Sequence, residues 1–237
     1  DARVNLGDAN IAGTTTINVT DELTSEAKSE ITIDASSKPG SANTDSSLDA
    51  AVVNVNVVDV GIPVIVPAGF TSGADMTVGG GAVITAGTKA TFKATDLIDV
   101  ETTADGEVAG TAGATLAGTI VDSDTIAAIT GNAAVTAPTV DLLASTTRTL
   151  VTTAKSPPAG AGDAAHTANP TRQALEDNDA QTSDGDLTIA AAVSVSHVQG
   201  NTNAFVDSAA ATAVTATTVL NVSASSTDAA SAIANAT

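Results

Sequence analysis

The sequence contains no cysteine, tryptophan or tyrosine, and its aromatic residues are three phenylalanines, Phe70, Phe92 and Phe205. The absence of cysteine excludes disulfide bonds, iron–sulfur clusters and zinc sites with thiolate ligands. Aromatic rings usually supply much of the buried area of a core. This chain must therefore build its core from valine, isoleucine, leucine and alanine, and regular stacking of small β-branched side chains is one way to do so.

Basic residues are also scarce: 8 lysines and arginines stand against 27 acidic residues, for a net charge of −19. This charge, with no basic cluster to offset it, argues against nucleic-acid partners and against anionic membrane surfaces. No run approaches the ~18 apolar residues of a membrane helix, so we expect no membrane insertion. The chain begins with Asp1 and not with methionine, which indicates a mature product or a piece of a longer protein.

Apolar and polar residues alternate with a period of two along most of the chain. Val53, Val55 and Val57, for example, alternate with Asn54 and Asn56. This pattern predicts strands with one buried face, here the valine face. Small polar residues between such segments suggest turns, so we expect short strands of about four to six residues and an all-β chain.

The chain also resembles itself. With Ala12, Ala86, Ala137 and Ala216 taken as equivalent, the separations are 74, 51 and 79 residues. The matched segments are Ile84–Thr88, Val135–Thr139 and Val214–Thr218, with Ile11–Thr14 as a weaker copy; farther along, Thr102–Asp105 matches Thr152–Lys155, and Val57–Asp59 matches Ile120–Asp122.

These matches divide residues 1–237, taken as a single region, into approximate repeats. The repeats are 1–50, 51–110, 111–187 and 188–237, with loop insertions rich in Ser, Asp, Gly and Pro at about 36–47 and 156–185. One repeat cannot bury its apolar face alone, whereas stacked repeats can.

The fold predicted from these patterns is a parallel β-helix (β-solenoid) of irregular repeats with loop insertions. Coils of roughly 20 residues would give about 12 coils and a rod of about 55 Å at the spacing of neighbouring strands. The main alternative is a β-sandwich, although such domains usually carry core aromatic residues that this chain lacks.

Segments of the type Val-Thr-Ala-x-Thr, each followed by a second alternating strand, resemble the repeats of giant bacterial surface proteins. These are the β-solenoid adhesins and filament proteins similar to filamentous haemagglutinin. The similarity covers most of the chain and is mainly compositional; the regular Gly-Gly-Asp turns of that family are missing. The resemblance implies secretion, a parallel β-helical shaft and a role in attachment or surface coating.

An acidic stretch near the second insertion is the best candidate metal site. Hard cations such as calcium need clustered oxygen ligands, which Asp177, Asp179, Asp184 and Asp186 would supply. The alternative is a solvated acidic loop, since EF-hand spacing is absent. His166 and His197 lack an accompanying carboxylate pattern and make only a weak zinc site.

Three sequons place candidate glycosylation sites at Asn18, Asn221 and Asn235. Such triplets also arise by chance in a chain rich in threonine and serine. Gly79–Gly81 lacks the Lys-Ser/Thr of a phosphate-binding loop, which favours a turn.

An enzyme is a further alternative, because some carbohydrate-active enzymes use β-helices. Asp122 and Asp124 would face the same side of one strand and could form a catalytic or cation-binding pair. A solvated strand face is the simpler interpretation, and tyrosine or tryptophan platforms for sugars are missing.

Together these features predict a non-enzymatic, extracellular structural protein, part of a cell-surface adhesin or filament. It would act without a cofactor, calcium apart. Its expected partners are other copies, associating end to end or side by side, and cell-surface or matrix components. One alternative is a β-sandwich, pilin-like subunit that polymerises by strand exchange, and a second is a β-helical carbohydrate-active enzyme.

Overall fold

The computed structural model describes residues 2–7, 14–37, 50–58, 72–106, 112–156, 189–208 and 214–236. These residues form twelve strands in two facing sheets of six strands each. The β8 sheet contains β1 (Ala2–Leu6), β4 (Ala50–Val58), β5 (Ser72–Val78), β8 (Ala112–Gly131), β10 (Ile189–Gln199) and β11 (Thr202–Ser208). The β9 sheet contains β2 (Thr16–Val19), β3 (Glu22–Ser37), β6 (Val83–Ala86), β7 (Lys89–Asp105), β9 (Ala134–Lys155) and β12 (Val214–Asn235).

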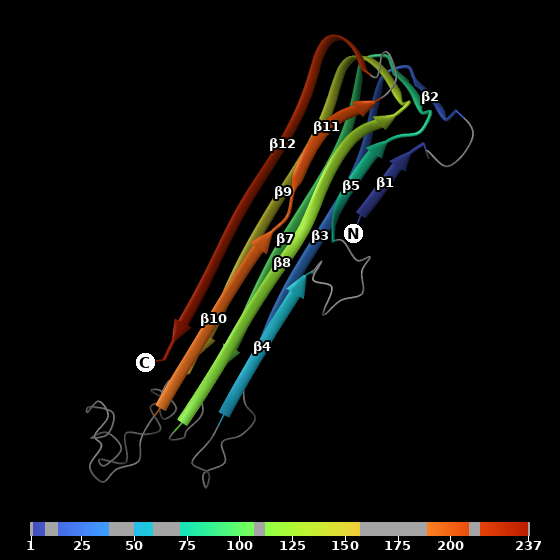
Figure 1. The fold of residues 1–237 in the computed structure, drawn as a ribbon. Helices are drawn as coiled ribbons and strands as arrows, with labels where there is room; N and C mark the ends of the chain where they lie inside the picture. Colours follow the sequence, from blue (N-terminus) through green and yellow to red (C-terminus); the bar gives the residue numbers. More distant parts are fainter. Residues whose placement is uncertain are drawn as a thin grey trace, which may run out of the picture.

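Each sheet is parallel throughout its described pairs. The strands of the two sheets run in opposite directions (Figure 1). The chain passes from the β8 sheet to the β9 sheet at the end where β8 turns into β9. Gly131 makes that turn with a positive φ of 64°, which a glycine adopts without a steric penalty. The predicted turn at Gly79–Gly81 lies at the same end, between β5 and β6.

The strands β3, β7, β9 and β12 lie side by side in that order and are long, up to 22 residues in β9 and β12. At ~3.3 Å per residue, a strand of that length spans about 70 Å. The long dimension of the molecule therefore runs along the strands and not across them (Figure 1).

The predicted parallel β-helix is therefore wrong, although the all-β class is confirmed. Its coils of about 20 residues would need a turn every few residues. Instead, β8 and β9 run along the length of their sheets without one. Polar residues such as Asp96, Thr146 and Arg148 lie inside β7 and β9 with buried side chains.

Neighbouring strands pair at long separations in sequence, and several of the matched segments are these neighbours. Thr136 and Ala137 pair with Thr215 and Ala216, and Thr85 pairs with Thr136, so that the separations of 79 and 51 recur as strand register. The separation of 74 does not recur: Ala86 pairs with Val19, and residues 11–13 lie outside the described part.

The other matches also meet as neighbours. Thr102 pairs with Thr152, and Val57 with Ile120. Residues 38–47 and 157–185 of the two predicted insertions lie outside the described part of the chain, whereas the preceding Ser36 and Ser37 belong to β3.

A proline explains an irregularity in the β9 sheet. Pro138 has no N–H to donate to the ladder, so the pairing must be interrupted at that position. Beside it, β12 contains an extra residue, and its register shifts between Ala216 and Val219. On the other side, β6 ends at Ala86 and β7 begins at Lys89. The interruption thus extends across neighbouring strands at one level.

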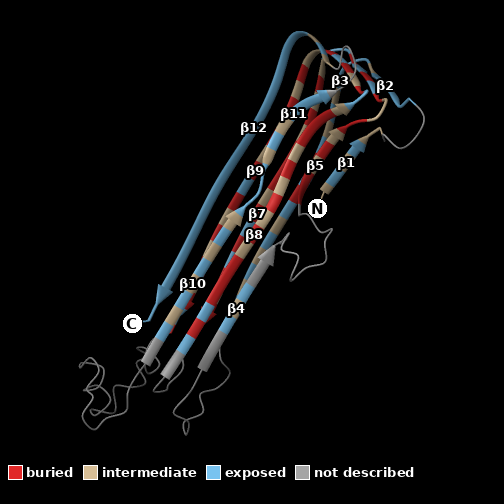
Figure 2. Cartoon of the chain, in the orientation of Figure 1, coloured by how far each residue is buried: buried red, intermediate tan, exposed pale blue. Residues whose placement is uncertain are grey.

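The core between the sheets is divided into layers along the strands. Inward-facing residues of β9 show the order: Leu142 and Ala144 are apolar, Thr146 and Arg148 polar, Leu150 apolar, Thr152 polar and Ala154 apolar. The three apolar layers are separate clusters, the largest beside the turn of β8 into β9. Burial is concentrated in the inner strands and is low along β12 (Figure 2).

The phase of β4 is opposite to the prediction. Val53 and Val55 are 61% and 50% exposed, and Asn54 points between the sheets. Its Nδ2 donates to the carbonyl oxygens of Ala35 and Thr103, at 2.9 and 3.0 Å. The nearby apolar layer consists of alanines, whose small side chains let the two sheets lie close together. The backbone carbonyls of the facing sheet are therefore within reach of β4 and need a hydrogen-bond donor, which Asn54 supplies.

No helix of the described residues is long and apolar enough to cross a membrane.

Candidate functional site

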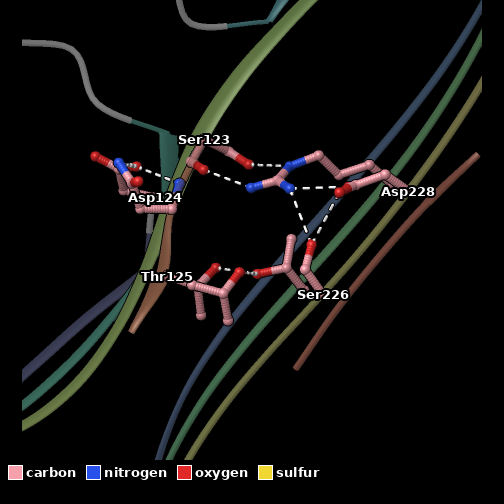
Figure 3. Close-up of polar contacts among 9 residues, drawn as sticks. Ser123, Asp124, Thr125, Ser226 and Asp228 are labelled. Atoms are coloured by element: carbon pink, nitrogen blue, oxygen red, sulfur yellow. Dashed lines mark hydrogen bonds and ion pairs between the residues drawn. The ribbon is translucent and has the colours of Figure 1, made fainter. Parts of the chain in front are cut away.

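A buried arginine lies at the centre of the molecule. Arg148, on β9, is 1% exposed and is the largest fully buried side chain of the described residues. Its Nε donates to Ser123 Oγ at 2.8 Å, and one terminal nitrogen donates to the carbonyl oxygen of Ser123 at 2.6 Å. The other terminal nitrogen donates to Asp228 Oδ1 at 2.9 Å (Figure 3). Arg148 thus connects β9 to β8 across the core and to β12 within its own sheet.

Threonine hydroxyls form two further links between the sheets. In the central polar layer, Thr146 Oγ1 lies 2.7 Å from Oγ1 of both Thr125 and Thr202. In the second polar layer, Thr119 Oγ1 lies 2.7 Å from Oγ1 of both Thr102 and Thr152. A hydroxyl both donates and accepts, so these groups satisfy one another in a core that is otherwise apolar.

Asp96, on β7, is the exception in the central polar layer. Its side chain is fully buried, and neither carboxyl oxygen has a partner with hydrogen-bond geometry among the described residues. Burial raises the pKa of Asp96, because the charged form loses its hydration. The hydroxyls of Ser123 and Ser29, and then the charge of Arg148, are close enough to oppose that rise, but they do not reverse it.

Asp122 and Asp124 do lie on one side of β8, with Ser123 facing the other way. Each carboxylate accepts from an amide: Gln199 Nε2 reaches Asp122 at 2.6 Å, and the backbone N–H of Asn201 reaches Asp124 at 2.8 Å. These bonds attach β8 to the segment containing β10 and β11. The two carboxylates therefore help to hold these strands together.

The remaining predicted site residues are placed as follows. Asp177, Asp179, Asp184, Asp186 and His166 lie outside the described residues. Within the described residues, no group of three or more His, Cys, Asp or Glu side chains could hold a metal ion.

The described sequon asparagines and the second histidine are on the surface. Asn18 is exposed on β2, and Asn221 and Asn235 are exposed on β12. His197 is exposed on β10, and its Nε2 lies 3.2 Å from Gln199 Oε1.

A shallow depression on the outer face of the β9 sheet has a volume of about 250 Å³ and lies over β3, β7 and β9. It contains the carboxylates of Glu30 and Asp99, and its other lining residues are threonine, isoleucine and leucine. The pKa of Glu30 is lowered by the hydrogen bond from Lys28.

The free edges of the sheets are the remaining candidate for function. We call the free sides of β1, β2, β3 and β4 the N-terminal edge, and those of β10, β11 and β12 the C-terminal edge. A free edge presents unpaired backbone donors and acceptors to any strand that approaches.

No protein-family model, curated protein or solved structure matches this chain.

Proposed function

We propose that this chain is a non-enzymatic, extracellular structural protein that forms part of a cell-surface adhesin or filament. The observation that carries the proposal is the continuous pairing in the β9 sheet. Residues 22–37 of β3 pair with 89–104 of β7, and these pair in turn with 139–154 of β9 and the matching stretch of β12. A sheet of this extent, with a core joined by hydrogen bonds between its layers, supports a role based on stiffness.

The chemistry of the polar groups supports the same proposal. Arg148 donates to Ser123, and the threonine hydroxyls bond to one another, inside the core. The net charge of −19 keeps such a surface solvated and repels other acidic surfaces. Attachment would therefore involve uncharged or basic regions of cell-surface or matrix components.

Display on cells that lack their own adhesins tests the proposal. Cells carrying the wild-type chain should attach to matrix-coated surfaces or bear visible surface filaments. The control is a chain with Leu142→Ala, which removes a fully buried side chain. The displayed variant should unfold at moderate temperature. Turnover of an acidic polysaccharide that is lost on Asp122→Asn, or display that produces neither attachment nor filaments, would contradict the proposal.

A further inference from the structure

The two edges of the molecule match each other position by position. In the β9 sheet, Glu22 pairs with Lys89, Lys89 with Thr139, and Thr139 with Val219. At the other end of the same strands, Ser37 is connected through Ala104 and Ala154 to Ala234. Residues 22–37 and 219–234 therefore span the same length, at opposite edges of one sheet.

The β8 sheet shows the same correspondence. Through β8, Ala50–Val58 of β4 are level with Ala190–Val198 of β10. Through β5 and β8, Ala2–Leu6 of β1 are level with Thr202–Val206 of β11. Because every described pair is parallel, the N-terminal edge of a second copy would meet the C-terminal edge in the same geometry that joins strands inside the chain.

Apolar side chains are left uncovered at these edges. Among the residues whose burial the structure describes, twelve large hydrophobic ones are exposed, and all but Val83 and Leu116 lie on end strands. They are Val53 and Val55 on β4, Val193 and Val195 on β10, Phe205 and Val206 on β11, and Val219, Leu220, Val222 and Ile233 on β12. Stacking in register would place Leu220 next to Leu23 of the second copy, and Val206 next to Leu6.

Charge favours this head-to-tail contact over contact between two N-terminal edges. The outer face of β3 carries four exposed carboxylates, at Glu22, Glu26, Glu30 and Asp34, and a single exposed lysine, Lys28, so its net charge is negative. Like charges on directly opposed strand positions are destabilising, so two N-terminal edges repel each other. The residues level with these carboxylates on β12 are uncharged: Val219, Ser223, Thr227 and Ser231.

We propose that a second copy of this chain adds head to tail to the C-terminal edge, an inference that rests on the proposed structural function. Its β3 and β1 pair in parallel with β12 and β11, and Glu22 of the added copy lies beside Val219. β4 stays one strand away from this contact, because it pairs directly with β8 and is level with β5 and not with β1. Such a contact does not close on itself, so it generates filaments. Four strands per copy at ~4.8 Å give a rise of about 19 Å per copy, across the strand direction.

Engineered cysteines test the register, since the chain has none of its own. Asn221 and Thr24 are exposed, lie at level positions on opposite edges, and are three strand spacings apart within one chain. That distance of about 14 Å is too long for a disulfide within one copy. The variant with Asn221→Cys and Thr24→Cys should form a ladder of disulfide-linked multimers on mild oxidation.

The matched control combines Asn221→Cys with Thr32→Cys, equally exposed on β3 but about 26 Å away along the strand. We expect roughly tenfold less cross-linked product from the control, because the sulfur atoms cannot meet in register. Circular dichroism verifies that both variants are folded. Equal ladders from the two variants, or a wild-type chain that sediments as a monomer at high concentration with no ladder from the matched pair, would overturn the proposal.

The outcome is separable from that of the display experiment. Attachment by a chain that stays monomeric would leave the proposed function standing and refute this contact. Ordered head-to-tail filaments of a chain that degrades a polysaccharide would do the reverse.

Discussion

The neighbouring strands β9 and β12 are equally long, pair along almost their whole length, and yet differ sharply in burial. In β9 every second side chain is buried, whereas β12 is exposed from its fifth residue to its end. Leu142 of β9 is fully buried, while Leu220 of β12, also on the inward side, is 50% exposed.

The difference arises from neighbours and not from the residues themselves. β9 has β7 on one side and β12 on the other, whereas β12 has only β9. An inward-facing side chain is covered from both sides only when strands lie on both sides of it. Burial here is therefore a property of position in the sheet, which three comparisons between inner and end strands test.

The largest effect is expected for the same substitution at the two leucines. Leu142→Ala removes fully buried atoms and leaves a cavity, at a cost of about 3 kcal/mol in the free energy of unfolding. Leu220→Ala, at a half-exposed site, should cost less than ~1 kcal/mol. Urea denaturation at low protein concentration measures both values, and equal costs would contradict the comparison.

The second effect concerns the ion pair between the two strands. Arg148→Met removes the donors to Ser123 and leaves its buried oxygens unpaired, which should cost about 2 kcal/mol. Asp228→Asn keeps an acceptor for Arg148 at a side chain that is 43% exposed, so its cost should stay below ~1 kcal/mol. Thermal unfolding of the two variants measures both costs. A larger loss of stability in the Asp228 variant would contradict the expectation that the buried contacts of Arg148 with Ser123 contribute more than its ion pair with Asp228.

The smallest effect, and the only stabilising one, is expected at Asp96. Burial raises the pKa of Asp96 above its ordinary value of 3.8. The folded state therefore binds the proton more tightly than the unfolded state does. The resulting stability is complete below pH 3.8 and is lost as the pH rises through the raised pKa.

Asp96→Asn removes this loss and should stabilise the protein by about 1 kcal/mol at pH 7. The difference between variant and wild type should vanish toward pH 3.5, near the ordinary carboxyl pKa. Asp228→Asn is the matched control at an exposed carboxylate and should not reproduce this pH dependence. A wild type that is more stable than the Asp96 variant at pH 7 would show that Asp96 acts as an essential counter-ion of Arg148.

The sequence predicted the strand class. Period-two alternation identified strands, and the matched residues Thr102 and Thr152 are neighbours in the structure, a pairing that the expected coils of about 20 residues did not predict. Side chains that stack in a column between parallel strands share one environment, so similar residues recur there. The weak match at Ile11 does not correspond to a described pairing, because Ala86 pairs with Val19.

The length of the strands and the central polar layer were missed for one reason. Isolated charges are rarely buried, so no predicted feature of the sequence placed Asp96 and Arg148 in the core. The phase of β9 contained the correct signal: counting by two from Leu142 reaches Thr146, Arg148 and Leu150 on one face. Counting by two could not predict which face of β4 points inward. That choice depends on carbonyl groups of other strands, to which Asn54 donates.

The strand direction determines how the molecule responds to force. Backbone hydrogen bonds between parallel strands point across the strands, and the long dimension of the molecule lies along them (Figure 1). A tensile load along that dimension shears many bonds of β9 at once, while a load at right angles peels β12 away one bond at a time. A molecule anchored at the two ends of its long dimension therefore resists extension with many hydrogen bonds at once. A force that lifts one end of an edge strand breaks its hydrogen bonds one after another.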